Sequence, residues 1–167
     1  RVMGVEILKP VIEKISIDQA LKNFTGEVEQ EYPPYSSKPV DGKPLFQIAR
    51  EGRLADIEIP KHKVNIFKIE TLEEKTILKD DMLKHIKSVV SSVDGDFRQE
   101  EILKDWERFM DESKISEFPI IKIFVSCGSG AYMRTIAHEI GKILGVKSLA
   151  YHIKRTKIGE YDIKSVK

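Results

Sequence analysis

A short run near the C-terminal end brings together side chains that could act on a reacting group. The apolar stretch ending at Cys127 is followed by Gly128-Ser129-Gly130 and then by Tyr132 and Arg134, which open an amphipathic pattern. A strand that turns sharply into a helix would set an aromatic ring and a fixed cation side by side. The two glycines also fit a phosphate-binding turn, where amide groups and the helix dipole attract anions. However, Met133 stands where a dinucleotide fingerprint needs glycine, so the local sequence favours a structural tight turn.

The cysteines and histidines of the sequence do not indicate a disulfide or a metal site. Cys127 is the only cysteine, so no internal disulfide can form and no zinc-type set of cysteines exists. His138-Glu139 begins a zinc-protease pattern, but Lys142 stands where the second histidine belongs. We therefore expect no metal. The remaining histidines have no evident partners and are expected on the surface or partly buried: His62, His85 and His152.

The composition predicts one buried core, with room for an appended subdomain. Of 167 residues, 41% are hydrophobic and 33% charged. No apolar run reaches the ~20 residues of a membrane span, and the N-terminus lacks a secretory pattern, so we expect a cytoplasmic protein. Because the chain opens at Arg1 on an apolar stretch, we expect a piece of a longer protein.

The net charge of +1 hides an uneven distribution. Residues 142 to 157 hold five basic and no acidic side chains, whereas residues 71 to 118 hold thirteen acidic against eight basic ones. A polyanionic partner would avoid the acidic part of the chain and approach the basic part.

The hydrophobic patterns predict alternating helices and strands. Ser16-Ile17-Asp18-Gln19 has the form of a capping box before a short helix that Gly26 ends. The proline-rich stretch 31–44 should be extended, with a turn at Asp41-Gly42, and Pro44 should open a short helix that ends at Gly52. Further along the chain we expect a strand at 63–70, two helices separated by Asp94-Gly95, a strand at 118–127, a helix at 131–144, a strand at 148–156 and an extended segment at 161–163.

The glycine corner resembles a motif of the TruB family of tRNA pseudouridine synthases. That motif reads roughly Cys-Ser-Lys-Gly-Thr-Tyr-Ile-Arg, and the chain matches it at Cys127, Gly130, Tyr132 and Arg134. The resemblance implies that Arg134 pairs with a catalytic aspartate and that Tyr132 lines the pocket for a flipped uracil. Ile153-Lys154-Arg155 is similar to a second family motif, which implies that Ile153 lies beneath the base and that Lys154 and Arg155 contact RNA.

The proline-rich part of the chain is similar to another segment of the same family. The matching residues are Gln30, Pro33, Tyr35, Ser36, Gly42, Phe46, Ala49, Arg50 and Gly52. The resemblance implies that residues 30–53, the thumb segment, form a thumb-like loop that grips the T stem-loop of tRNA. Its RNA contacts would come from Tyr35, Ser36, Lys38, Lys43 and Arg50. A proline-rich ligand for another protein is the alternative interpretation of this segment.

The resemblance implies a fold and an activity. The fold is α/β (α+β), the pseudouridine synthase fold, with a mixed, mostly antiparallel sheet and flanking helices. Residues 1–167 would be the C-terminal part of the catalytic domain. Residues 71–117 lie outside the resemblance and are longer than the connection common in the family, so we expect an inserted acidic helical hairpin packed outside the sheet. The activity is isomerisation of the T-loop uridine of tRNA, without a cofactor, by a monomer.

The expected nucleophile of that reaction is missing from the chain. No Gly-x-Leu-Asp-Pro type motif occurs, so the catalytic aspartate is expected upstream of Arg1 and this piece alone should be inert. Two other functions stay open. One is an RNA-binding or RNA-chaperone module on the same scaffold, and the other is a protein-interaction domain built around the acidic hairpin.

Overall fold

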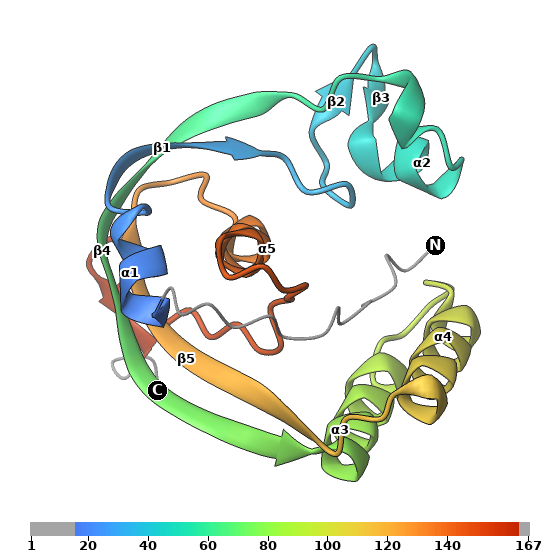
Figure 1. The fold of residues 1–167 in the computed structure, drawn as a ribbon. Coiled ribbons are helices and arrows are strands. Elements are labelled where there is room, and N and C mark those ends of the chain that lie inside the picture. Colours follow the sequence, from blue (N-terminus) through green and yellow to red (C-terminus); the bar gives the residue numbers. More distant parts are fainter. Residues whose placement is uncertain (1–15, 164–167) are drawn as a thin grey trace.

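The computed structural model describes residues 16–163 (Figure 1). The helices are α1 (Ile17–Lys22), α2 (Leu45–Arg50), the 3-10 helix η1 (Leu54–Asp56), α3 (Lys79–Ser91), α4 (Gln99–Glu112) and α5 (Met133–Ile143). The strands are β1 (Gly26–Glu31), β2 (Pro39–Val40), β3 (Lys43–Pro44), β4 (Lys61–Leu78), β5 (Glu117–Cys127), β6 (Lys157–Ile158) and β7 (Tyr161–Asp162).

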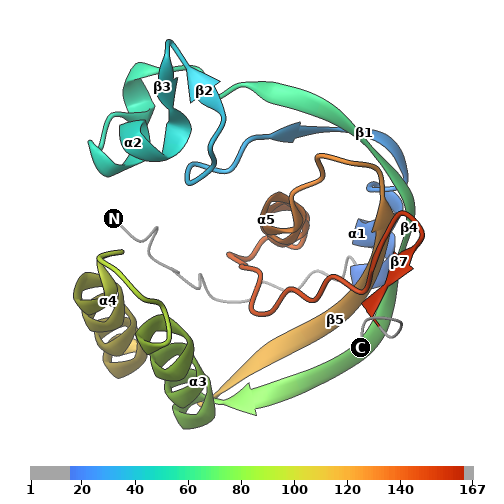
Figure 2. The ribbon, with the colours of Figure 1, turned by 180° about the vertical axis from the view of Figure 1, so that it is seen from behind.

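The long strand β4 organises the sheet. Its first part, Lys61 to Ile66, pairs antiparallel with β1, and the part from Ile66 to Leu78 pairs antiparallel with β5 on its other edge. Two register shifts interrupt the β4–β5 pairing, and such irregularities bend and twist a strand. The paired strands curve around α5, with the thumb segment at one end of the arc and α3 and α4 at the other (Figures 1 and 2). The expected α+β class with a mostly antiparallel sheet is confirmed.

The main core lies between the sheet, α1 and α5. The capping box is present, with the Ser16 hydroxyl accepting from the Gln19 amide and the Gln19 side chain accepting from the Ser16 amide. Apolar side chains one helical turn apart on α1 and α5 face alternate residues of β4. A helix repeats its face about every 3.6 residues and a strand every two, so each element presents one apolar face to the core. The buried members of this core are Leu21, Phe24, Val64, Ile66, Ile136 and Ile140.

The thumb segment folds as its turn residues predict. Asp41 and Gly42 have φ angles of 50° and 79° and form the two-residue turn between β2 and β3. Pro44 precedes the first helical residue instead of occupying it. The short helix α2 buries three of its apolar side chains, Leu45, Ile48 and Ala49, and Gly52 follows with a φ of 72°.

The expected helical insertion at 71–117 is partly wrong. Residues 71–78 extend β4, and only residues 79–112 contain helices. The charged stretch at 73–75 shows no alternation because β4 and β5 form a two-stranded ribbon there, with both faces open to water. The α3–α4 hairpin therefore sits at the end of a ribbon, not against the outside of the sheet, and has its own core of Met82, Ile86, Met110 and Phe118.

The strand expected at 148–156 does not form. The chain after α5 instead returns along that helix: the Val146 amide donates to the Gly141 carbonyl, and the Ser148 hydroxyl donates to the Ala137 carbonyl. Tyr151 packs against His85 of α3 with ring centroids 4.5 Å apart, whereas Leu149 and Ile153 of the same segment are exposed. In the described residues that follow α5, strands form only at β6 and β7.

Among the described residues, no helix has the length and apolar character of a membrane-spanning segment.

We expect Gly141→Ala to destabilise the fold. A methyl group at this buried position in α5 would lie 2.6 Å from the Val146 carbonyl oxygen and also meet the Ser148 side chain. Overpacking of this kind costs about 1–3 kcal/mol of the free energy of unfolding. Alanine raises helix propensity by ~1 kcal/mol, so a net loss reports the clash. Urea denaturation measures it, with the exposed Lys142→Ala as control. Unchanged stability would show that the 146–148 return is not closely packed.

Candidate RNA-modification site

The glycine corner between β5 and α5 forms a tight turn. The Gly128 amide donates to the Asn65 carbonyl at 2.8 Å, which continues the pairing with β4 beyond Cys127. Gly130 has a φ of 88°, a conformation that side-chain-bearing residues rarely adopt. The chain then enters α5 through Tyr132, whose carbonyl accepts from the Thr135 and Ile136 amides. This geometry places Tyr132 and Arg134 at the beginning of α5.

The start of α5 is tied to the end of β1 by two hydrogen bonds. The Tyr132 amide donates to the Gln30 side-chain oxygen at 3.0 Å, and Gln30 is only 4% exposed. The Thr135 hydroxyl donates to the Glu31 carbonyl at 3.2 Å. Amides in the first turn of a helix lack partners within the helix, so a side-chain acceptor here stabilises both elements. The corner is thereby fixed to the point where the chain enters the thumb segment.

Three rings surround this junction. Tyr32 stacks on His62 with centroids 4.2 Å apart, and Tyr132 meets both rings edge-on at 5.7 and 5.8 Å. Such edge-on contacts are favourable for aromatic pairs. These contacts pack the Tyr132 ring against Tyr32, which follows β1, and against His62 of β4.

The sequence predicts no partner for His62, but the structure provides one. Its Nε2 lies 3.0 Å from the Gly130 carbonyl oxygen, and a carbonyl can only accept, so Nε2 carries the proton. Its Nδ1 is buried and has no hydrogen-bond partner among the described residues. The register that pairs Gln30 with His62 brings this ring to the corner, and no local motif announces it.

Arg134 joins the corner to the thumb segment. Its side chain is exposed, and Nη2 donates to the Tyr35 carbonyl at 3.3 Å. Within residues 16–163, no carboxylate forms an ion pair with Arg134. An exposed guanidinium without an ion-pair partner presents a planar pair of N–H donors that matches a carboxylate. The position is therefore suited to bind an incoming acidic group.

The other thumb residues lie in three different settings. Lys38 places its ammonium 5.1 Å from the Tyr32 ring centroid, beside the aromatic cluster. Ser36 is 5% exposed, and its hydroxyl has no partner among the described residues. Lys43 forms an exposed ion pair with Glu51, and the Arg50 guanidinium lies 5.6 Å from the Phe46 ring. The structure therefore brings Tyr35 and Lys38 to the corner and leaves Lys43 and Arg50 near α2.

Ile153, Lys154 and Arg155 lie in an exposed, irregular stretch. Ile153 is 52% exposed, and in the described part of the chain no hydrogen bond or ion pair connects these three residues to Arg134. Burial raises the pKa of the Cys127 thiol, and the charge of Arg155 partly offsets that rise.

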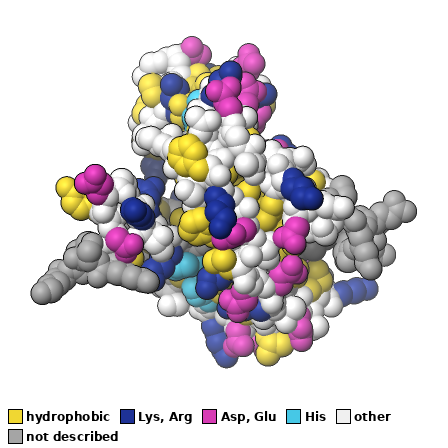
Figure 3. All heavy atoms as spheres, turned by 90° about the vertical axis from the view of Figure 1, so that its left-hand side faces the viewer, with side chains coloured by type: hydrophobic (Ala, Val, Ile, Leu, Met, Phe, Trp, Pro, Cys, Tyr) yellow, Lys and Arg dark blue, Asp and Glu magenta, His cyan; other side chains and the backbone are white. Residues whose placement is uncertain are grey.

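Charges on the convex side of the sheet are mixed (Figure 3). Lysines of β4 pair with glutamates of β1 across the strands, as Lys63 does with Glu27 at 2.8 Å. These exposed pairs leave no continuous basic surface there for a polyanion. The described residues also contain no group of three or more His, Cys, Asp or Glu side chains that could hold a metal ion.

We expect Gln30→Met to destabilise the corner by about 1–3 kcal/mol, because it removes the buried acceptor of the Tyr132 amide at nearly constant volume. Urea denaturation measures the loss, and the Tyr132 amide should exchange with solvent faster. Gln47→Met, an exposed change of the same type on α2, is the control. Equal stability of the two variants would contradict the role given to Gln30.

Sequence comparison relates the chain to known proteins. Residues 4–97 match the sequence profile of the TruB family pseudouridylate synthase (N terminal domain). The tRNA pseudouridine synthase B of Staphylococcus saprophyticus is 32% identical over 148 residues, covering 89% of this chain and 36% of that protein. Its counterpart in Caldicellulosiruptor saccharolyticus is 31% identical over 154 residues, covering 92% of this chain and 38% of that protein. The chain thus spans rather more than a third of these curated relatives. Since the profile covers more than half of the chain, the protein belongs to the TruB family of pseudouridylate synthases.

Proposed function

We propose that the whole protein isomerises a uridine of tRNA to pseudouridine, with the T stem-loop as its substrate. The curated relatives carry the name tRNA pseudouridine synthase B, which supports this reaction. The reaction breaks the N-glycosidic bond, turns the base and joins a ring carbon to the same ribose, so it requires no cofactor. We further propose that the protein acts as a monomer in the cytoplasm.

The hydrogen bond between Arg134 and Tyr35 is the observation that carries the proposal. It joins the corner to the thumb segment, although the two residues are 99 positions apart in the chain. In the proposed mechanism Arg134 holds the nucleophilic aspartate, which another part of the whole protein supplies. A bidentate guanidinium orients that carboxylate and keeps it ionised.

The aromatic rings at the corner suit an extruded base. Taking a uridine out of a folded RNA loop costs a few kcal/mol, and stacking of the base on side chains of a closely fitting pocket must offset this cost. In the proposal Tyr132 lines this pocket and Ile153 lies beneath the base. Tyr32 and His62 hold the Tyr132 ring from behind, because both contact it edge-on.

The proposed RNA path runs over the concave side of the arc. The thumb segment would grip the stem with Tyr35, Lys38, Lys43 and Arg50, while Lys154 and Arg155 would add positive charge from the opposite side. RNA is recognised by shape and by backbone contacts, which suits cations spread over a loop. Ser36 would reach RNA only after a movement of the loop, since its hydroxyl is buried.

We expect Arg134→Ala in the full-length protein to lower single-turnover pseudouridine formation by about 10²-fold or more, because the nucleophile loses its orienting partner. Binding of a T stem-loop RNA should change little. Arg134→Lys keeps the charge but loses the fork, so it should recover only part of the rate. Nucleoside analysis of the reacted tRNA measures the product.

Lys142→Ala, at the other end of α5, serves as the control for general damage to this helix. Normal turnover of Arg134→Ala would refute the role given to the arginine. A wild-type protein that binds T stem-loop RNA but forms no pseudouridine would support the RNA-binding module instead.

A further inference from the structure

The loop between α3 and α4 reaches the thumb segment. We call residues 92–98 the tip. In it, Arg98 Nη1 donates to the Tyr35 hydroxyl at 3.1 Å. The Phe97 ring lies 6.0 Å from the Arg50 guanidinium, within the range of a cation–π contact. The hairpin at the far end of the ribbon thus contacts the two ends of the loop proposed to grip RNA.

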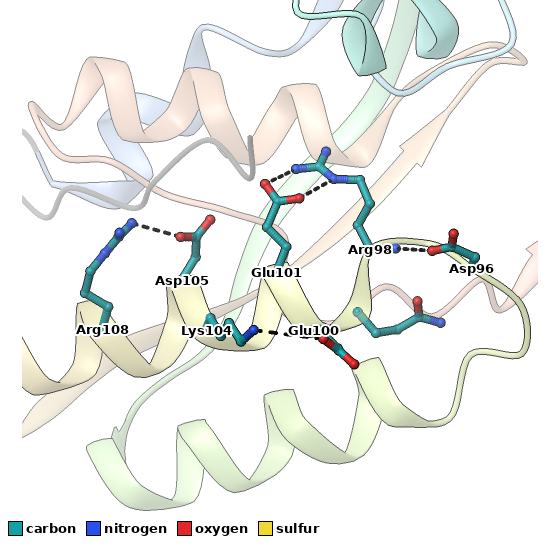
Figure 4. A pocket seen from close by; sticks show the side chains of 8 residues that line it. Asp96, Arg98, Glu100, Glu101, Lys104, Asp105 and Arg108 are labelled. Atoms are coloured by element: carbon teal, nitrogen blue, oxygen red, sulfur yellow. Dashed lines mark hydrogen bonds and ion pairs between the residues drawn. The ribbon is translucent and has the colours of Figure 1, made fainter.

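The Arg98 side chain is oriented to donate a hydrogen bond to Tyr35. Its Nε and Nη2 bind the two carboxylate oxygens of Glu101 at 2.7 and 2.5 Å, as Figure 4 shows. This pairing lowers the pKa of the Glu101 carboxyl, so the pair stays ionised at neutral pH. The carboxylate matches the charge of Arg98 and fixes the plane of its guanidinium, which leaves Nη1 aimed at Tyr35. An arginine held in this way is better suited to position a neighbour than to capture phosphate.

The backbone of the tip is held in an unfavourable conformation at this same residue. Arg98 has a φ of 64° and a ψ of 33°, which residues other than glycine rarely adopt. The Gln99 side chain holds the tip in place by accepting from the Phe97 amide at 2.8 Å and donating to the Gly95 carbonyl at 2.6 Å. Such strain persists where the surroundings impose it, and it often marks a functional position.

We propose that the tip is a clasp that orders the thumb segment in the free protein, with Arg98 as the positioning residue for Tyr35. Tyr35 is then held at both ends, by Arg98 at its hydroxyl and by Arg134 at its carbonyl. A loop ordered before binding loses less conformational entropy when RNA arrives. The clasp itself is a property of the free protein, and its effect on RNA rests on the proposed function.

The same contacts allow a competing model, in which the tip blocks the thumb segment. Two carboxylates of the tip would repel a polyanion, namely Asp94 and Asp96, whereas Glu100 and Glu101 pair with cations. A blocking tip would have to leave before RNA binds, so its loss would strengthen RNA binding. The ordering clasp predicts weaker RNA binding when it is lost, because the thumb segment then loses more conformational entropy on binding.

Hydrogen exchange of the full-length protein tests the clasp without RNA. Arg98→Met and Tyr35→Phe remove the contact from opposite sides, and each should speed exchange of thumb amides about two- to tenfold, as expected for one lost hydrogen bond. The double variant should exchange no faster than the faster single variant. The matched control is Arg108→Met, which breaks a similar pair with Asp105 on the same helix. Thumb exchange that stays at the wild-type rate in both single variants would overturn the clasp.

The effect on RNA is measured with the same variants. Arg98→Met should raise KM for tRNA about two- to tenfold and change kcat less than about twofold, because bound RNA orders the loop anyway. This split differs from that of Arg134→Ala, which should lose kcat. Tighter T stem-loop binding by Arg98→Met would establish the blocking model and overturn ours. A wild-type protein that neither binds this RNA nor forms pseudouridine would refute the proposed function, while the exchange experiment still decides the clasp.

Discussion

The hydrogen bond from the Tyr132 amide to the buried Gln30 side chain is the constraint on which the candidate site depends. It fixes where α5 begins relative to the end of β1, over a separation of 102 residues. Two segments of the proposed site start at this junction, the thumb segment on one side and the first turn of α5 on the other. A buried side-chain acceptor without a partner costs free energy, so the loss of this bond opposes any shift of either segment.

The curved sheet converts that local constraint into a larger arrangement. Because β4 pairs with β1 over its first part and with β5 over the rest, it is the one strand that spans the whole arc of the described chain. Its curvature places α5 on the concave side and turns the α3–α4 hairpin back toward the thumb segment (Figure 1). The arginines at 98 and 134 can therefore hold the same tyrosine from two elements that are distant in sequence.

Sequence patterns predicted the helices and strands that have one buried and one exposed face. They did not predict segments in which all side chains have similar exposure. The β5 strand and α5 follow from an apolar run and a helical period, and the turn at Asp41-Gly42 follows from residues that tolerate positive φ. The extension of β4 through 71–78 was missed because a two-stranded ribbon exposed to solvent on both faces shows no alternation of apolar and polar residues. The contact of His62 with Gly130 and the reach of Arg98 to Tyr35 depend on register and curvature, which no local motif encodes.

The two-stranded ribbon that carries the α3–α4 hairpin has a length that cannot vary freely. Each residue added to both strands would carry the hairpin about 3.3 Å outward, so a pair in each strand would separate the hairpin from the thumb segment by ~7 Å. A single added residue would also rotate the hairpin to the opposite face. Relatives with a ribbon of another length should therefore lack the arginine–tyrosine contact, and ribbon length and the residue at position 98 should change together in the family's evolution.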